Sequence, residues 1–192
     1  MNKLILLLLC LAAPSAWAHS ADSVAGGFIS GFLHPIAGWD HVIAMVAVGL
    51  WGAFLGRPAV WLLPVVFPMV MAVGGALGVV GVPLPGVEVG IALSAVVLGA
   101  MVALAARPPL WVAAVVVAVF AIFHGHAHGT ELPQAASPIA YSLGFVIATG
   151  LLHAVGIAFS LLTRWPQGQR VVRAGGAVIA ALGALFLTRA LS

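Results

Sequence analysis

Long apolar stretches alternate with short polar breaks along this chain. Six of them predict membrane-spanning helices, because a helix needs about 20 apolar residues to cross a bilayer. Proline and arginine mark most of the breaks, where they end helices and resist entry into lipid. The pattern therefore predicts an all-α membrane protein, a bundle of six transmembrane helices in a single domain over residues 19–192. The six stretches are 28–55, 59–81, 86–106, 109–127, 138–162 and 171–190.

The first stretch is longer than one straight span requires. Residues 24–55 therefore predict a kink, or a short interfacial segment, that ends at Pro35, since proline suits the first turn of a helix.

Composition favours the same class of protein. The chain has 192 residues, of which 64% are hydrophobic and 6% charged, too little charge to cover the surface of a soluble domain. The formal net charge is +3, but the basic residues are scattered and form no patch. Nucleic acid is therefore not expected as a partner.

The first 18 residues form a separate element. "MNKLILLLLCLAAPSAWA" has a positive start, a short apolar core and an Ala-x-Ala end, which predicts a secretory signal peptide cleaved after Ala18. The mature chain would begin at His19, whose amine and imidazole offer a weak metal-binding position. It would contain no cysteine, because Cys10 is the only one, and hence no disulfide or thiolate metal site.

The arginines predict an orientation in a bacterial inner membrane. With the mature N-terminus in the periplasm, five arginines fall on the cytoplasmic side and only Arg189 falls on the other, as the positive-inside rule requires. The five are Arg57, Arg107, Arg164, Arg170 and Arg173.

Ionisable side chains inside apolar stretches are costly and are candidates for function. In this orientation the candidates gather near the periplasmic ends of stretches one, three and four. On a continuous helix His34 and His41 would point within about 20° of each other, and His41 would share a face with Met45. The candidates are His34, Asp40, His41, Glu88, His124, His126, His128 and Glu131.

The segment "FHGHAHGTE", residues 123–131, refines this picture. His124, His128 and Glu131 follow the i, i+4, i+7 spacing of one helical stripe, and His126 lies off it. Imidazole and carboxylate groups without a thiolate favour nickel, cobalt, zinc or manganese over copper(I) or an iron–sulfur cluster. The sequence thus predicts a bound or transported divalent metal and no resident prosthetic group.

Two further positions have both functional and structural interpretations. His153, near the middle of the fifth stretch, is a candidate transfer site for the metal with Thr149 one turn away, or else a hydrogen-bonding partner of a neighbouring helix. Glu88 is a candidate ligand, or else favours the start of the third helix, where carboxylates interact well with the helix dipole.

Three segments resemble the signature motifs of the HupE/UreJ family, small membrane proteins associated with nickel supply to hydrogenase and urease. They are "HPIAGWDH" followed by "VIAMVAVGLWG", then "FHGHAHGTE", and the glutamate within "PGVEVGIALSAVVLG". The resemblance covers essentially the whole mature chain and implies a hydrogenase or urease maturation system as partner. It implies a metal-handling role for His34, Asp40, His41, Glu88, His124, His128 and Glu131.

The function favoured by these observations is a secondary permease that imports a divalent metal, nickel before cobalt or zinc, and not an enzyme. The alternative is a metal-dependent intramembrane hydrolase in which histidines, Asp40 and Ser94 hold zinc and a nucleophilic water. Against it, a catalytic zinc site typically has three protein ligands and one water, whereas the seven residues with an implied metal-handling role gather here. A metal-binding accessory protein that transports nothing is a third possibility.

The charge asymmetry yields a topology prediction. Residues 129–137 should be periplasmic and residues 166–169 cytoplasmic. Single cysteines at Thr130 and Gln167 should therefore react with a membrane-impermeant thiol reagent from opposite sides of the membrane. Reaction of both cysteines from the same side would contradict the predicted orientation. It would also contradict the prediction that the candidate polar residues lie together near the periplasmic side.

Overall fold

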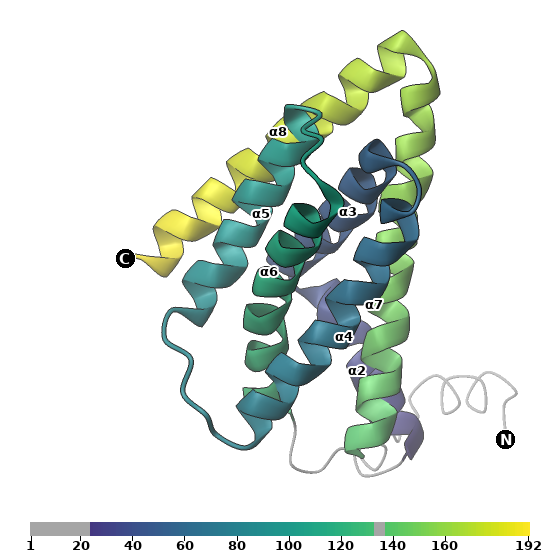
Figure 1. Ribbon diagram of the computed structural model, residues 1–192. Helices are drawn as coiled ribbons and strands as arrows, with labels where there is room; N and C mark the ends of the chain where they lie inside the picture. Colours follow the sequence, from purple (N-terminus) through teal and green to yellow (C-terminus); the bar gives the residue numbers. More distant parts are fainter. Residues whose placement is uncertain (1–23, 133–136) are drawn as a thin grey trace, which may run out of the picture.

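A computed structural model describes residues 24–132 and 137–192 of the chain, and all regular elements in these residues are helices (Figure 1). The predicted signal peptide and His19 lie outside the described residues. The helices are α2 (Val24–Ala37), α3 (Trp39–Leu55), α4 (Ala59–Val79), α5 (Val87–Ala103), α6 (Leu110–Thr130), α7 (Pro138–Ser160), the 3-10 turn η1 (Leu161–Arg164) and α8 (Pro166–Ala190).

Most of these helices are long and apolar enough to cross a membrane. Within the described residues, α4, α6, α8 and α7 extended by η1 meet this criterion. Helices α2 and α3 meet it together as a pair bent by 82°, and α5 is a shorter apolar helix of 17 residues. The chain is therefore an all-α, multi-pass membrane protein, which confirms the predicted fold class, with a bent first segment and a short third one.

The break in the first segment lies at Gly38 and not at Pro35, so the predicted position was wrong. Pro35 lies inside α2, and Gly38 has an extended backbone between the two helices. A Cβ at Gly38 would lie only 2.9 Å from Asp40 Oδ1 and 3.1 Å from His41 Nδ1. Because glycine has no Cβ, the side chains of Asp40 and His41 can occupy the space next to the bend.

His34 and His41 would point the same way only on a continuous helix, and the bend between them means that they do not share one helical face. His34 belongs to α2 and His41 to α3, with 82° between the two helices. Their side chains nevertheless converge, because both contact α6 rather than each other's helix.

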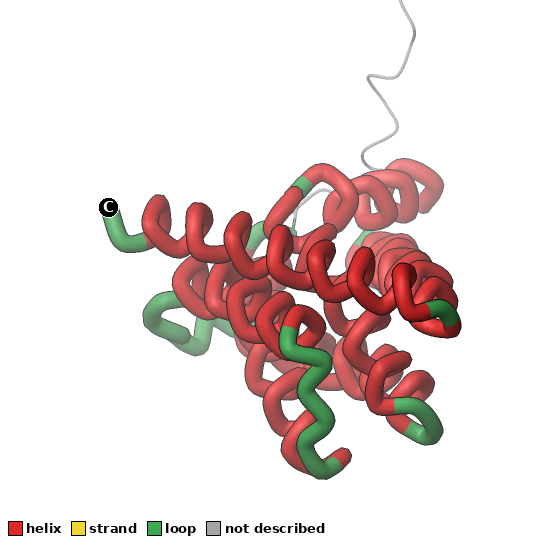
Figure 2. Tube along the Cα trace, turned by 90° about the horizontal axis from the view of Figure 1, so that it is seen from above, coloured by secondary structure: helices red, strands yellow, loops and turns green. Residues whose placement is uncertain are grey.

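The helices pack in close pairs, α4 with α6, α5 with α8, and both α2 and α3 with α7 (Figures 1 and 2). Glycines allow backbone contact in these pairs, as is common in lipid, where packing replaces the hydrophobic drive between helices. A Cβ at Gly125 of α6 would collide with the Met71 carbonyl of α4, and one at Gly183 of α8 would crowd Val96 of α5.

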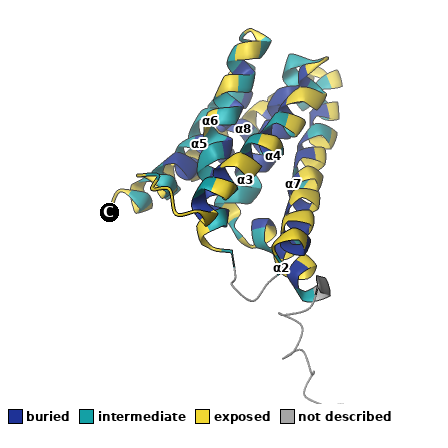
Figure 3. Ribbon diagram, turned by 60° about the horizontal axis from the view of Figure 1, so that its bottom comes forward, coloured by how far each residue is buried: buried dark blue, intermediate teal, exposed yellow. Residues whose placement is uncertain are grey.

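The outer surface of the bundle is apolar. On α4, Phe67 and Met71 are buried, whereas Val65 and Met69 are more than half exposed on the opposite face. Figure 3 shows similar exposed strips along α7. Lipid rather than water is the solvent that suits such a surface.

One end of the bundle carries the connections from α3 to α4, from α5 to α6 and from α7 to α8, and the α4–α5 connection lies at the other end (Figure 1). The first three connections contain Arg57, Arg107 and Arg164. Arg173, near the start of α8, donates from Nε to the Ala103 carbonyl at 2.7 Å. The arginines predicted to be cytoplasmic therefore share one end of the bundle, and the membrane side of that end stays a prediction.

The glycine contacts predict a stability difference between two alanine variants. Gly125→Ala forces α4 and α6 apart and should lower the free energy of unfolding by about 1–3 kcal/mol, the usual cost of overpacking. Gly150→Ala on α7 is the control, because its Cβ would meet nothing within 4 Å. Thermal unfolding in detergent measures both, and equal melting temperatures for the two variants would contradict the packing argument.

Candidate metal-binding site

Four histidines from three helices form a continuous line of rings, which we call the imidazole row. His34 of α2 lies 4.8 Å from His128 of α6, measured between ring centroids. His128 lies 4.6 Å from His41 of α3, and His41 lies 4.8 Å from His124 of α6. The row thus joins residues that are far apart in the sequence.

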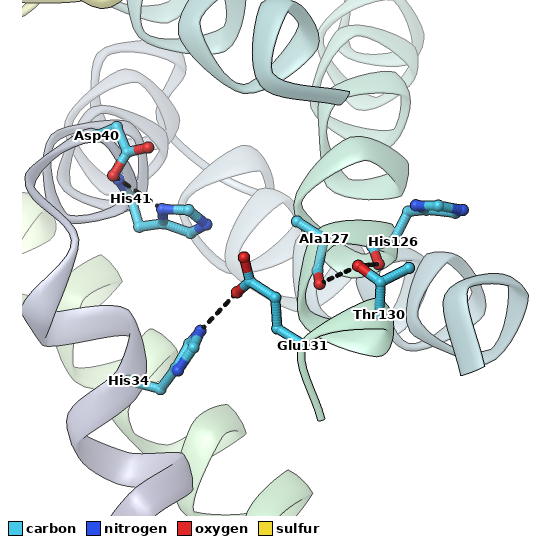
Figure 4. A network of polar contacts seen from close by, with 7 residues as sticks. All are labelled: His34, Asp40, His41, His126, Ala127, Thr130 and Glu131. Carbon is cyan, nitrogen blue, oxygen red and sulfur yellow. Dashed lines mark hydrogen bonds and ion pairs between the residues drawn. The ribbon is translucent and has the colours of Figure 1, made fainter. Parts of the chain in front are cut away.

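Glu131 extends the row toward the surface. Its Oε2 lies 3.2 Å from His34 Nε2 (Figure 4). One ligand atom each from His34, His128 and Glu131 all lie within 4.8 Å of one another. Metal–nitrogen bonds of about 2.0–2.1 Å place ligand atoms closer than this, so the three side chains need to move inward only slightly to bind one ion.

The two ends of the row differ in burial. The side chains of Glu131 and His34 are 57% and 33% exposed and that of His41 is 13% exposed, whereas His128 is buried and His124 is fully enclosed. The site therefore has an accessible carboxylate at one end and an enclosed imidazole at the other.

Asp40 orients His41 at the bend between α2 and α3. The His41 ring donates from Nδ1 to Asp40 Oδ1 at 3.0 Å, and the His41 backbone N–H donates to the same oxygen at 3.0 Å. This arrangement leaves Nε2 of His41 as the unprotonated nitrogen. Metal-binding histidines usually donate their other ring N–H to a carboxylate or a carbonyl in this way, which fixes the orientation of the ring.

Ser94 of α5 orients His124 in a similar way. Its hydroxyl donates to the Ile91 carbonyl at 2.6 Å, so Oγ accepts from His124 Nε2 at 2.9 Å. The unprotonated nitrogen of His124 is therefore Nδ1.

Several buried ring nitrogens of the row have no hydrogen-bond partner. Among the described residues they are His41 Nε2, His124 Nδ1 and both nitrogens of His128. Unsatisfied buried polar atoms are uncommon in native proteins and point to a ligand. A divalent metal suits these nitrogens, and the carboxylates of Asp40 and Glu131 carry two negative charges that would balance it.

Aromatic side chains surround the row, and the sequence pattern did not indicate them. Phe145 of α7 packs on His128 with 4.3 Å between ring centroids, and Tyr141 lies 5.9 Å from His34. Phe67 of α4 lies 5.5 Å from both His124 and His153. An aromatic residue in an apolar helix resembles any core residue in sequence, so only the fold reveals its place.

His126 points away from the row (Figure 4). Its Nε2 donates to the Val82 carbonyl at 2.7 Å, which ties α6 to the connection between α4 and α5. This residue therefore has a structural partner outside the row.

The remaining candidates lie outside the imidazole row. Glu88 lines a separate cavity together with Asp40. Met45 is buried in the hydrophobic core, and His153 is buried on α7 beyond Phe67. The structure thus gathers His34, His41, His124, His128 and Glu131, with Asp40 behind His41, and separates Glu88, Met45, His126 and His153 from them.

Together, the fold and the site define a multi-pass membrane protein with an intramembrane cluster of histidines and carboxylates. The chain belongs to the HupE/UreJ family, since the family described as "HupE / UreJ protein" matches residues 7–186. It is 44% identical to Protein HupE of Rhizobium leguminosarum bv. viciae over 186 residues, 97% of each chain. No solved structure matches it.

The geometry predicts that His128 and His126, which are close in sequence, differ in their effect on metal binding. His128→Ala removes a ring from the row and should weaken Ni²⁺ binding at least tenfold, because even the loss of an outer-shell partner typically costs that much. His126→Ala should leave binding nearly unchanged and cost about 1 kcal/mol of stability from one lost hydrogen bond. Equilibrium Ni²⁺ binding to the purified variants measures this, and equal losses of affinity would contradict the assignment of the row.

Proposed function

We propose that this protein is a secondary transporter that imports a divalent transition metal, preferably Ni²⁺, from the periplasm to the cytoplasm of a bacterial cell. The observation that carries the proposal is the imidazole row, which runs from an exposed carboxylate to an enclosed histidine. Nickel is favoured because the HupE/UreJ family is associated with supply of this metal to hydrogenase and urease, the maturation systems proposed as partners here.

The ion first meets Glu131 and His34, the two most exposed groups. Their charge and nitrogen donors replace part of its water shell while the ion is still in contact with solvent. His128, whose two ring nitrogens are unpartnered, then completes a site with these two residues.

Transfer along the row exchanges one ligand at a time. Neighbouring rings are 4.6–4.8 Å apart, so a rotating side chain can take over the ion before the previous one releases it. Such closely spaced sites let an ion bind well enough to enter and weakly enough to leave. Asp40 provides the negative charge for this step through its contact with His41.

Beyond His124 the path is closed by Phe67, which packs on His124 and His153. His153 and Thr149, one turn apart on α7, are buried on the far side, and neither side chain has a hydrogen bond of standard geometry. We assign His153 as the inner transfer site and displacement of Phe67 as the opening step.

The membrane potential is a sufficient driving force. A divalent ion that moves to a negative interior gains about 4.6 kcal/mol per 100 mV, twice the value for a unit charge, enough for roughly thousandfold accumulation. The intramembrane hydrolase has less support, because the Ser94 hydroxyl donates to Ile91 and accepts from His124, an arrangement that ties it to the scaffold.

The transport proposal predicts the effect of Asp40→Asn. The amide keeps the shape and can still accept from His41, but it lacks the charge that balances a dication. Uptake of radioactive Ni²⁺ into vesicles with an imposed inside-negative potential should fall to background, while the variant still inserts and folds. Unlabelled Co²⁺ and Zn²⁺, added as competitors, establish the order of preference.

His126→Ala is the matched control in the same vesicles and should retain uptake, because His126 bonds to Val82 outside the row. Wild-type rates in Asp40→Asn would contradict the proposed role of its charge. Binding without potential-driven uptake by the unmodified protein would instead favour an accessory role.

A further inference from the structure

Asp40 lies at the boundary between the imidazole row and a second compartment. A cavity of about 260 Å³ opens among α3, α5 and α8, with Asp40 in its lining. At roughly 30 Å³ for each water molecule, it has room for a hydrated divalent ion. The lining residues are Asp40, Glu88, Ala92, Phe186, Arg189 and Ala190.

The cavity contains an unusual combination of charges. Asp40 and Glu88 contribute two carboxylates and Arg189 contributes one guanidinium, a net charge of −1. Among the described residues neither carboxylate forms an ion pair with Arg189, so the cation shares the space without being locked to a partner. The other arginines lie at the opposite end of the fold, whereas Arg189 lies at the C-terminal end of α8.

The packing of α8 on α5 fixes this arrangement. Arg189 shares one face of α8 with Phe186 and Ala190, at i, i+3 and i+4 spacing, and this face borders the cavity. A Cβ at Gly183 would crowd Val96 and Ala95, so the two backbones are in direct contact one to two turns away. Arg189 is thus an exposed residue at the edge of the cavity, on the α5–α8 helix pair that also carries Glu88.

We propose that Arg189 is a tethered competing cation that weakens metal binding at His41, beside Asp40, and so speeds transfer of the ion along the imidazole row. This inference rests on the proposed function. In it, Arg189 sets the affinity of the site for the metal and the maximal rate of transport. A positive charge near this site repels an arriving dication twice as strongly as a monovalent ion. Transport requires binding weak enough for the ion to leave, and Arg189 supplies this weakening.

The test compares Arg189→Gln with the wild-type protein in two measurements. Equilibrium binding of Ni²⁺ to purified protein in detergent should tighten roughly fivefold, the effect of removing one unit charge several ångströms from a dication in a hydrated cavity. Uptake of radioactive Ni²⁺ into vesicles should show a lower KM together with a lower maximal rate. Arg189→Lys keeps the charge and should restore both values.

Arg170→Gln is the matched control, because it removes the same charge near the other end of α8 and should change neither measurement. A purely structural role of Arg189 at the C-terminal end of the α8 dipole would lower the melting temperature of Arg189→Gln without tightening binding. Unchanged or weaker Ni²⁺ affinity in Arg189→Gln would overturn the inference.

The two proposals can fail separately. If the wild-type protein binds Ni²⁺ without transporting it, the transport function is wrong, yet the affinity of Arg189→Gln still tests the tethered cation. If transport proceeds and Arg189→Gln binds with wild-type affinity, the inference about Arg189 is wrong and the transport function stands.

Discussion

The hydrogen bond from His41 to Asp40, at the bend between α2 and α3, is the contact on which the candidate site depends. It holds a carboxylate and an imidazole against each other at 3.0 Å and leaves the second ring nitrogen of His41 free toward α6. Gly38 leaves space for both side chains at the bend, because a Cβ there would crowd them. Without this corner, His34 and His41 could not approach the histidines of α6 from two directions.

The rest of the bundle keeps this corner in place by close backbone packing. Gly125 lies between His124 and His126 and contacts the backbone of α4, so a close helix contact coincides with the histidine segment of α6. Polar side chains on one helix thus receive fixed positions from a contact between backbones. This combination suits a membrane, where packing sets helix positions and ionisable groups are retained for function.

Asp40 connects two compartments of the structure. On one side it holds His41 within an enclosed row of rings, and on the other it lines an open cavity with Glu88 and Arg189. The sequence predicted that all these carboxylates lie in one layer of the membrane, and the structure brings Asp40 and Glu88 to one cavity. The sequence provided no means of separating Glu131, which contacts His34, from Glu88, which does not, because angular position around the bundle depends on helix order and not on depth.

The sequence by itself determined the fold class, the positions of the helices and the stripe of His124, His128 and Glu131, because apolar length and 3.6-residue periodicity are local properties. Only the tertiary structure decided that the first segment bends at Gly38, where a Cβ would crowd Asp40 and His41, rather than at Pro35. It also decided that Phe67 lies between His124 and His153, and that Arg189 of the last helix borders Asp40 of the first membrane segment. These contacts join residues distant in the chain, and no local pattern encodes them.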